Sequence, residues 1–257
     1  MDILRKELNE IYAAQNLEAS SLPADELQMH KQMADILVRL NNACAVITDA
    51  SCDRSYIFSG SLAELMGFAK AKGTVQEVLS SDEDEIYNRI HPEHLVDKRL
   101  LEYEFFKYVD ALPPDEKLNF KAVCHLKIKD NRGNYRYIDN STQVLHLSPD
   151  GKIWLILCCY DLSADQDEHY GINPRIINNS SGEVKELSFV TKRKNILSER
   201  EKEILRLIQD GKPSKQIAGL LEISIHTVNR HRQNIISKLS VGNSIEAITA
   251  AKSMKLL

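Results

Sequence analysis

ISIHTVNRHRQNIISKL, residues 223–239, combines a regular apolar spacing with an unusually polar remainder. At 3.6 residues per turn, Val228, Ile235 and Leu239 fall on one stripe of a helix. Ser224 suits the N-cap position, because its hydroxyl accepts a backbone N–H of the first turn. The segment is therefore predicted to be a helix with one buried face.

The opposite face of this helix carries no carboxylate, although a solvated helix normally mixes both signs of charge. Its residues are His226, Asn229, Arg230, Gln233 and Ser237. Side chains of these types are the donors and acceptors that contact base edges and phosphates. The face is either a basic surface in water or a surface for nucleic acid.

Three further helices are predicted around this one. Residues 197–211, LSEREKEILRLIQDG, begin with a capping box at Ser198 and Glu201 and end at a glycine. Residues 212–223 form a second short helix, and residues 243–254 form the last. Two short helices joined by a tight turn, with a polar face on the second, describe a helix-turn-helix.

Residues 197–251 resemble the LuxR-type, or GerE-type, four-helix DNA-binding domain. The resemblance is carried by L-S-x-R-E at 197–201, I-L-x-L-I at 204–208, Gly211, K-Q-I-A at 215–218, I-S-x-x-T-V at 223–228, His231, N-I at 234–235, K-L-x-V at 238–241, Asn243 and E-A at 246–247. It implies that the third helix lies in the major groove of promoter DNA, that the protein is a homodimer, and that RNA polymerase is a further partner.

The same resemblance implies roles for single residues. The base-reading candidates are Asn229, Arg230 and Gln233, and the phosphate-contacting candidates are Lys215, Thr227, Lys238 and His226. Two positions depart from the usual pattern in ways that bear on the fold. Glu222 occupies a turn where glycine or a small polar residue is usual, and Gly219 costs its helix about 1 kcal/mol relative to alanine. Ser244 replaces a common arginine, and Arg232 lies near the buried stripe, so its stem is expected to pack while its head reaches out.

The charge is unevenly distributed along the 257 residues. Residues 191–257 hold 13 Lys and Arg against 6 Asp and Glu, whereas the remainder holds 20 against 31. A basic domain on an acidic body is expected where only that domain meets a polyanion.

The acidic body is predicted to contain five antiparallel strands with short helices between them. The strands are CAVITDAS at 44–51, SYIFSG at 55–60, FKAVCHLKIK at 120–129, YRYIDNSTQVLHL at 135–147 and IWLILCCYD at 153–161. The helical pieces are expected around LAELMGF at 62–68 and VQEVLSSDEDEIYNRI at 75–90.

This order resembles a PAS domain over residues 41–162. The resemblance is carried by Y-I-F-S-G-S-L-A-E-L-M-G-F at 56–68, R-I-H-P-E-H at 89–94, K-x-x-R-G-N-Y-R-Y-I-D at 129–139, S-P-D-G-K-I at 148–153 and C-C-Y-D-L-S at 158–163. It implies a sensory or dimerising module, with a small-molecule ligand inside the sheet as one option. The asparagine usual near the end of the second strand is Ser59 or Gly60 here.

No cofactor or metal is predicted from this part of the sequence. The Asn-Cys-Arg-Phe run of flavin photosensors is absent. His91 and His94 are the only histidines placed for an axial haem ligand, and with Glu93 they lack a distant further ligand for a metal. No nucleophile–base pair, phosphate loop or pair of carboxylates suggests an enzyme.

The segments around the two domains have predictions of their own. Residues 3–15 and 23–40 are expected to be amphipathic helices, the first with Leu4, Leu8 and Ile11 on its stripe and the second with Met33, Ile36, Leu37 and Leu40. Such helices cover the sheet or pair with a second subunit, and pairing is favoured. Residues 163–190 are expected to be a linker with a hairpin at RIIN–NSSG–EVKEL, 175–187.

The sequence as a whole predicts an α+β chain in the order N-terminal helices at 1–40, PAS-like domain at 41–162, linker at 163–190 and helix-turn-helix domain at 191–257. No run approaches the roughly 20 apolar residues of a membrane span. MDILRKELNE lacks a signal-peptide core, and five cysteines without Cys-x-x-Cys favour a reducing cytoplasm over a disulfide framework.

Three functions fit these patterns to different degrees. A one-component transcription regulator needs only the two domains. A response regulator needs a phosphoacceptor such as Asp49, but three successive antiparallel strands disagree with the βα order of a receiver. An acyl-homoserine-lactone sensor needs a Trp/Tyr/Asp set, and the single tryptophan, Trp154, lies in a late strand. The PAS-like domain is a sensor or, alternatively, a ligand-free docking module.

Overall fold

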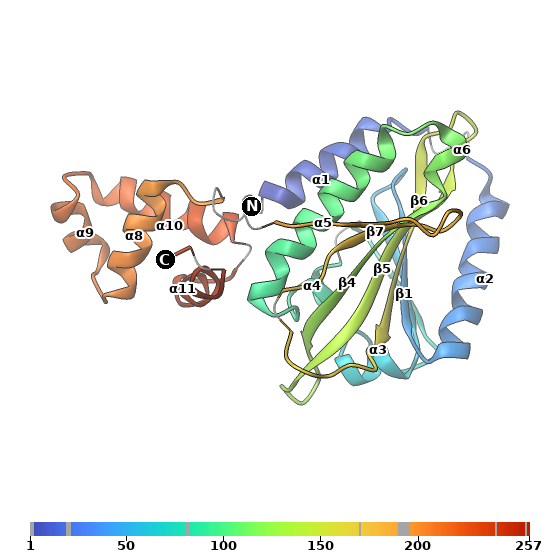
Figure 1. Ribbon diagram of the computed structural model, residues 1–257, viewed down its shortest axis with the longest axis horizontal. Helices are drawn as coiled ribbons and strands as arrows, with labels where there is room; N and C mark the ends of the chain where they lie inside the picture. Colours follow the sequence, from blue (N-terminus) through green and yellow to red (C-terminus); the bar gives the residue numbers. More distant parts are fainter. Residues whose placement is uncertain are drawn as a thin grey trace.

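The computed structural model describes residues 3–18, 22–80, 83–169, 171–189, 196–239, 241–254 and 256–257. A sheet domain and a helical domain follow one another along the long axis of the molecule (Figure 1). The sheet domain contains α1 (Ile3–Ala14), α2 (Ala24–Asn41), β1 (Cys44–Asp49), β2 (Arg54–Ser59), α3 (Ser61–Met66), β3 (Val75–Val78), α4 (Asp84–Tyr87), α5 (Pro92–Asp110), α6 (Pro114–Lys117), β4 (Phe120–Lys129), β5 (Tyr135–Leu147), β6 (Ile153–Leu162), β7 (Arg175–Asn178) and β8 (Val184–Glu186). The helical domain contains α8 (Glu199–Gln209), α9 (Ser214–Leu220), α10 (Ile225–Lys238) and α11 (Ser244–Ser253).

One antiparallel sheet in the order β3-β2-β1-β6-β5-β4-β7-β8 forms the centre of the first domain. The five consecutive strands from β2 to β4 in this order are the five that the sequence predicts. The prediction of a five-stranded sheet is nevertheless wrong, because the sheet has eight strands. The additional strands extend both edges, where unpaired backbone groups of β2 and β4 accept them.

The edge of the sheet at β2 accounts for a second wrong prediction. Residues 75–90 were expected to be helical, but β3 pairs with β2 from Ser55–Val78 to Phe58–Val75. Among the described residues of this stretch, only Asp84–Tyr87 forms a helix. Pairing with the free edge of β2 outweighs the weak helical pattern of this stretch.

The predicted hairpin lies at the other edge of the sheet, next to β4. β7 and β8 pair with each other, and β7 also pairs with β4, from Phe120–Asn178 to Val123–Arg175. Gly182 has a φ of +76° in the connecting turn, a conformation that glycine adopts without strain. The hairpin of the expected linker is thus part of the sheet.

Helices cover both faces of the sheet (Figure 1). α5 and α1 lie on one face, where Tyr12 packs edge-on against Phe106 at 5.3 Å between ring centroids. α2 lies on the other, where Ala34 and Val38 join the strand residues of a smaller cluster around Trp154. Cys158 and Cys159 face these two cores in turn, as alternation along a strand predicts.

The length of the longest helix, α5, was not predicted from the sequence. The reason is that its charged residues are buried together with its apolar ones, so the helix shows no clear amphipathic period. Lys98 donates a hydrogen bond of 2.6 Å to Asn140 and lies 3.1 Å from the carboxylate of Glu102. Because these charges satisfy one another inside the domain, a polar sequence forms a buried helix.

One face of α2 packs on the sheet, and another face is exposed. His30, Ala34 and Val38 face the sheet and are buried. The predicted stripe points away from it: Met33, Ile36, Leu37 and Leu40 are exposed, together with Met29. The sequence therefore identified an apolar stripe that does not pack against any part of the chain that the structure describes. Of the first helix's stripe, Leu8 is buried and Ile11 partly buried, whereas the side chain of Leu4 lies outside the described residues.

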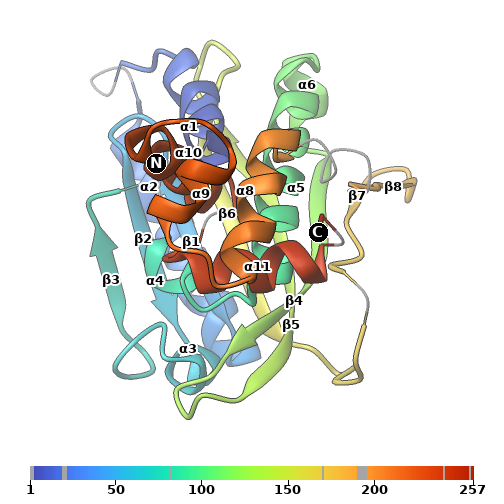
Figure 2. The same cartoon turned by 90° about the vertical axis from the view of Figure 1, so that its left-hand side faces the viewer.

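The buried apolar residues of the helical domain belong to the same hydrophobic cluster as the main core of the sheet domain, and they include Ile204, Leu205, Ile217, Val228, Ile235, Leu239 and Ala247. α11 faces α5 of the sheet domain, which Figure 2 shows behind it. Among the described helices, none is both long and apolar enough to cross a bilayer.

Candidate nucleic-acid interface

α10 is the helix predicted from residues 223–239, and its first turn is fixed locally. The hydroxyl of Ser224 accepts a hydrogen bond of 3.0 Å from the backbone N–H of Thr227, which makes Ser224 the N-cap. Val228, Ile235 and Leu239 are fully buried against α8, α9 and α11. The apolar stripe thus fixes the rotation of α10 and sends the opposite face to solvent.

The turn before α10 takes a left-handed conformation at Glu222, with a φ of +52°. This position is the one where glycine is usual, so the departure from the pattern leaves the turn geometry intact. The N–H of Ile223 donates to the carbonyl of Ala218 at 3.1 Å. Arg200 of α8 donates to the carbonyl of Leu221 at 2.8 Å, and this bond ties α8 to the turn.

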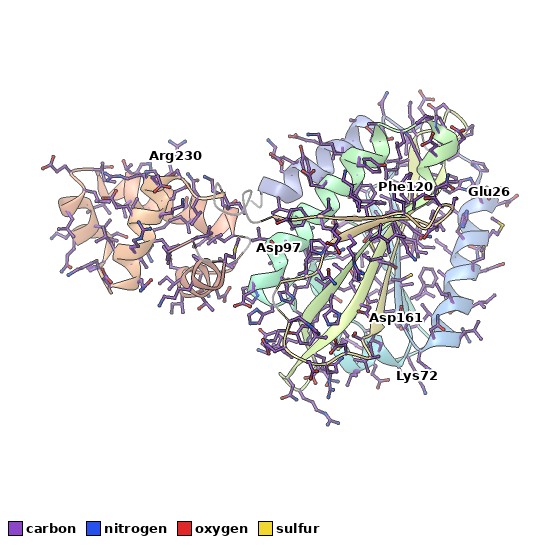
Figure 3. All side chains as sticks on the ribbon, viewed as in Figure 1. Glu26, Lys72, Asp97, Phe120, Asp161 and Arg230 are labelled. Atoms are coloured by element: carbon purple, nitrogen blue, oxygen red, sulfur yellow. The ribbon has the colours of Figure 1, made fainter. Side chains whose placement is uncertain are left out.

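The three base-reading candidates form one group on the outer face of α10. Asn229, Arg230 and Gln233 are all exposed. Within the described residues, no hydrogen bond or ion pair occupies these three side chains, which leaves their polar groups available. Figure 3 shows Arg230 at the upper edge of the helical domain. His226 is also exposed, one turn before Arg230.

The remaining phosphate candidates are not equivalent. Lys215 is exposed in the first turn of α9, whereas Thr227 is partly buried and its hydroxyl lies 2.8 Å from that of Ser224. Lys238 is engaged, because its ammonium group donates to the carboxylate of Glu201 at 2.7 Å. The structure therefore brings His226 and Lys215 to the surface and places Lys238 in an internal ion pair.

Glu201 is a buried carboxylate with a defined set of donors. It accepts from the backbone N–H of Ser198 at 2.8 Å, while its own N–H donates to the Ser198 hydroxyl at 3.2 Å. Burial opposes its ionisation, but the bonds from Lys238 and Ser198 outweigh burial, so the pKa of Glu201 lies below its ordinary value. The predicted capping box is present, and Lys238 completes it.

Arg232 has a role that the sequence did not reveal. Its guanidinium donates to the hydroxyls of Ser214 and Ser244 at 3.1 Å each, instead of reaching into solvent. The bonds connect α10 with the starts of α9 and α11. Ser244, which replaces a common arginine, is thus an acceptor for an arginine from the neighbouring helix. Beside it, a hollow of about 550 Å³ runs between α10 and α11, with Asn229 and Gln233 on its lining.

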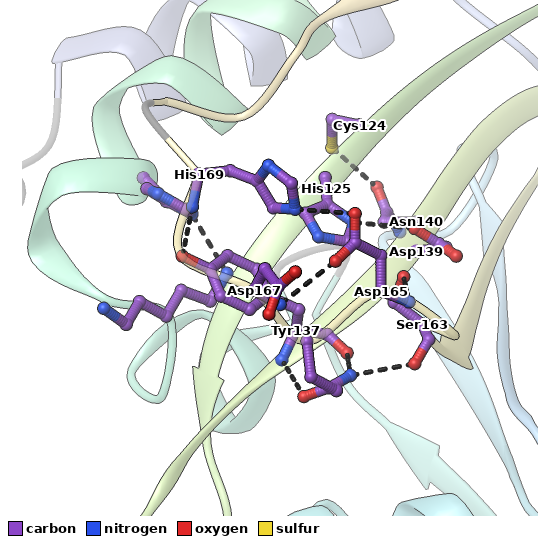
Figure 4. A network of polar contacts seen from close by, with 12 residues as sticks. Cys124, His125, Tyr137, Asp139, Asn140, Ser163, Asp165, Asp167 and His169 are labelled. Atoms are coloured by element: carbon purple, nitrogen blue, oxygen red, sulfur yellow. Dashed lines mark hydrogen bonds and ion pairs between the residues drawn. The ribbon is translucent and has the colours of Figure 1, made fainter.

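Histidines of the sheet domain form hydrogen bonds within that domain. His91 caps α5 by accepting from the N–H of Glu93, and His94 accepts from the N–H of Lys127 at 2.9 Å. On the outer face of β4 to β6, His125 bonds to Asp139 at 2.8 Å and stacks on Tyr137 (Figure 4). A hollow of about 780 Å³ lies over this network.

The family comparison agrees with the geometry of the helical domain. Residues 195–251 match the family described as bacterial regulatory proteins, luxR family. The C-terminal domain is therefore a LuxR-family helix-turn-helix domain.

Two relatives are similar to this chain over only a part of their length. The uncharacterized response regulatory protein YgeK of Escherichia coli K12 is 52% identical over 60 residues, which are 23% of this chain and 41% of that protein. The transcriptional regulatory protein DesR of Bacillus subtilis 168 is 50% identical over 58 residues, which are 23% of this chain and 29% of that protein. The chain thus matches less than half of each relative.

Two solved structures show low overall similarity. The phage VqmA–DPO complex aligns over 88% of this chain and 89% of its own, with 17% identity and a TM-score of 0.28. A sensory box histidine kinase/response regulator from Burkholderia thailandensis E264 aligns over 51% and 83%, with 14% identity and a TM-score of 0.34. These TM-scores are too low to indicate a shared fold.

Proposed function

We propose that this chain is a one-component transcription regulator that binds promoter DNA through its LuxR-family domain, with α10 in the major groove. The observation that carries the proposal is the outer face of α10, where Asn229, Arg230 and Gln233 are exposed and have no protein partner within the described residues. Arginine pairs with guanine, and asparagine or glutamine with adenine, through two hydrogen bonds each. A helix so equipped reads a short run of bases.

Selection of binding sites from random duplexes tests this proposal. The wild-type chain is expected to enrich one motif, and Arg230→Ala to lose about 1–3 kcal/mol on that motif while relaxing the preference at one position. Arg206→Ala is the matched control, because Arg206 is exposed on α8, outside the reading face. An unchanged motif with Arg230→Ala would reject this reading face.

The response-regulator alternative has less support from the sheet domain. Asp49, the residue suggested as a phosphoacceptor, is buried at the end of β1. Its carboxylate accepts from the Ser51 N–H at 3.0 Å and from the indole N–H of Trp154 at 3.1 Å. These bonds leave Asp49 as a fixed structural acceptor. Every strand pair described is antiparallel, whereas a receiver is built on a parallel sheet.

For residues 41–162 we propose a sensing or pairing module of PAS type that acts in the cytoplasm, where promoter DNA is found. The strand order β2-β1-β6-β5-β4, with α5 packed on one face, fits that proposal. The exposed stripe of α2 supports pairing of two chains, because an apolar row on a helix that already packs on its other side suits a second subunit.

Native mass spectrometry of the full-length chain tests both parts together, because it reports subunit number and bound mass. A dimer with additional mass is expected for a ligand sensor, and a bare dimer for a ligand-free docking module. A bare monomer would contradict pairing through α2.

A further inference from the structure

Three potential metal ligands from distant parts of the chain meet beneath α2. Glu26 and His30 are four residues apart on this helix, so they lie on one side of it. His146 comes from β5, where the register with β6 shifts on both sides of this residue. The shift at His146 interrupts the regular pairing, and the ring meets that of His30 with 5.0 Å between centroids.

The distances match those around a small ion. Nε2 of His30 lies 3.2 Å from Nδ1 of His146. Ligand atoms of Glu26, His30 and His146 all lie within 4.8 Å of one another. Two nitrogens each 2.0–2.1 Å from a tetrahedral zinc ion are separated by about 3.3 Å, so the two imidazoles need almost no movement to share a cation.

The environment favours ligation as well. His30 is only 8% exposed, and its Nε2 faces Nδ1 of His146 inside the domain. A neutral imidazole has one ring nitrogen with a lone pair, which is the group that binds a transition-metal ion. Glu26 is partly exposed and supplies the one negative charge of the group.

From this juxtaposition we propose that Glu26, His30 and His146 bind a divalent first-row transition metal, with Zn²⁺ as the best fit. Two imidazoles and one carboxylate are a zinc ligand set, and a fourth position remains for water or a further ligand. Without the ion, one facing nitrogen carries a proton and donates it to the other. When the cation binds, the donor ring takes its other tautomer, with its proton on the nitrogen that faces away, so both facing nitrogens offer a lone pair.

The bound ion would link α2 to the sheet. Glu26 and His30 belong to the first half of α2, and His146 to the strand beneath it. The same helix presents the exposed apolar stripe on its far side. If the proposed pairing through that stripe holds, metal occupancy also fixes the surface that the second subunit meets. The metal site itself does not depend on that pairing.

The single tryptophan provides the measurement. The ring of Trp154 lies 5.5 Å from that of His146. We would titrate untagged, chelator-treated full-length protein with Co²⁺ and follow Trp154 fluorescence together with the visible absorption of the bound ion. Stoichiometric quenching is expected, and Zn²⁺ should reverse it. A Zn²⁺ concentration of 100 times Kd should raise the melting temperature by about 5–10 °C.

Variants assign the binding to this site. His30→Gln, His146→Gln and Glu26→Gln should each weaken Co²⁺ affinity, the two histidine variants by more than about 100-fold, the upper end for outer-shell partners. Glu26→Gln changes a partly exposed residue, so it leaves folding intact even where a histidine variant does not. His169→Gln is the control, since that histidine pairs with Asp165 elsewhere. Absence of stoichiometric quenching, or quenching that survives all three substitutions, would leave only a histidine–histidine hydrogen bond here.

Discussion

The ammonium group of Lys238 lies 2.7 Å from the carboxylate of Glu201, and this ion pair joins the end of α10 to the start of α8. The carboxylate is nearly inaccessible, with 4% of its side chain exposed, whereas the lysine keeps 25%. Lys238 thus neutralises a buried charge that also closes the capping box of α8. A lysine that resembles a phosphate contact has a structural partner within the protein, and the two roles differ in their measurable consequences.

Lys238→Met is expected to destabilise the helical domain by about 1–3 kcal/mol, because it leaves the buried Glu201 carboxylate without its cation. Urea unfolding followed by circular dichroism measures this loss. The slope of log K against log salt for DNA binding should stay at the wild-type value. Lys212→Met, at an exposed lysine between α8 and α9, should leave stability unchanged. A slope reduced by about 1 with normal stability would instead make Lys238 a phosphate contact.

The same pair makes stability depend on pH. The pKa of Glu201 is lowered in the folded state, so its contribution is complete above the unfolded value of about 4.3 and is lost as the pH falls through the folded value. The difference in unfolding free energy between wild type and Glu201→Gln should therefore be constant from about pH 7 to about pH 5 and shrink below about pH 4. Unfolding curves across this range measure it. A difference that grows on acidification would contradict the pair.

The helical domain could be predicted well because its signals are local. A cap, an apolar stripe and a turn lie within a few residues of each other, so periodicity alone placed Val228 inside and Arg230 outside. Contacts across the domain escaped prediction. Nothing in the sequence connects Lys238 to Glu201, or Arg232 to Ser214, before the helices are packed.

Less of the sheet domain than of the helical domain could be predicted from the sequence. Alternation identified the inner strands and the turn identified the β7–β8 hairpin, whereas β3 and the pairing of β7 with β4 depend on edges that exist only after the sheet forms. No helical period is visible in the sequence of α5, because Lys98 and Glu102 are buried together with apolar residues. Glu26 and His30 have a ligand-like spacing, but their third partner, His146, lies 116 residues beyond His30.

The left-handed turn at Glu222 leads to a prediction about stability. A non-glycine residue there costs about 1–2 kcal/mol, whereas glycine costs about 0.5–1 kcal/mol of chain entropy. Glu222→Gly should therefore be neutral or raise the unfolding free energy by up to about 1 kcal/mol, and Glu222→Val should lower it by about 1 kcal/mol or more. Chemical denaturation distinguishes these outcomes.

Gly219, three residues earlier, is the matched comparison, because its backbone conformation does not require glycine. A Cβ added there meets nothing within 4 Å, and its φ is not positive. Gly219→Ala should stabilise α9 by about 0.5–1 kcal/mol. If Glu222→Gly lost as much stability as Glu222→Val, the left-handed turn would not be the conformation in solution.

Lys215 is the exposed lysine at the start of α9, and we expect it to contact phosphate. Lys215→Ala should weaken binding to every duplex by a similar factor and reduce the salt slope by about 1, without changing the selected motif. Binding isotherms at several salt concentrations, on a preferred and a random duplex, measure both quantities. Arg206→Ala should change neither. Unequal loss on the two duplexes would show that Lys215 takes part in reading sequence.

The exposed stripe on α2 yields the last prediction. Ile36 and Leu40 are 58% and 76% exposed, so replacing them with glutamate removes no packing within the chain. The double variant Ile36→Glu and Leu40→Glu should keep its unfolding free energy within about 0.5 kcal/mol of wild type. In sedimentation equilibrium it should nevertheless behave as a monomer where the wild-type chain is a dimer, because two charges cannot be buried unpaired in an apolar contact. Gln28→Glu, on the same helix beside the stripe, should remain dimeric. A double variant that stays dimeric would place the contact between subunits on another surface.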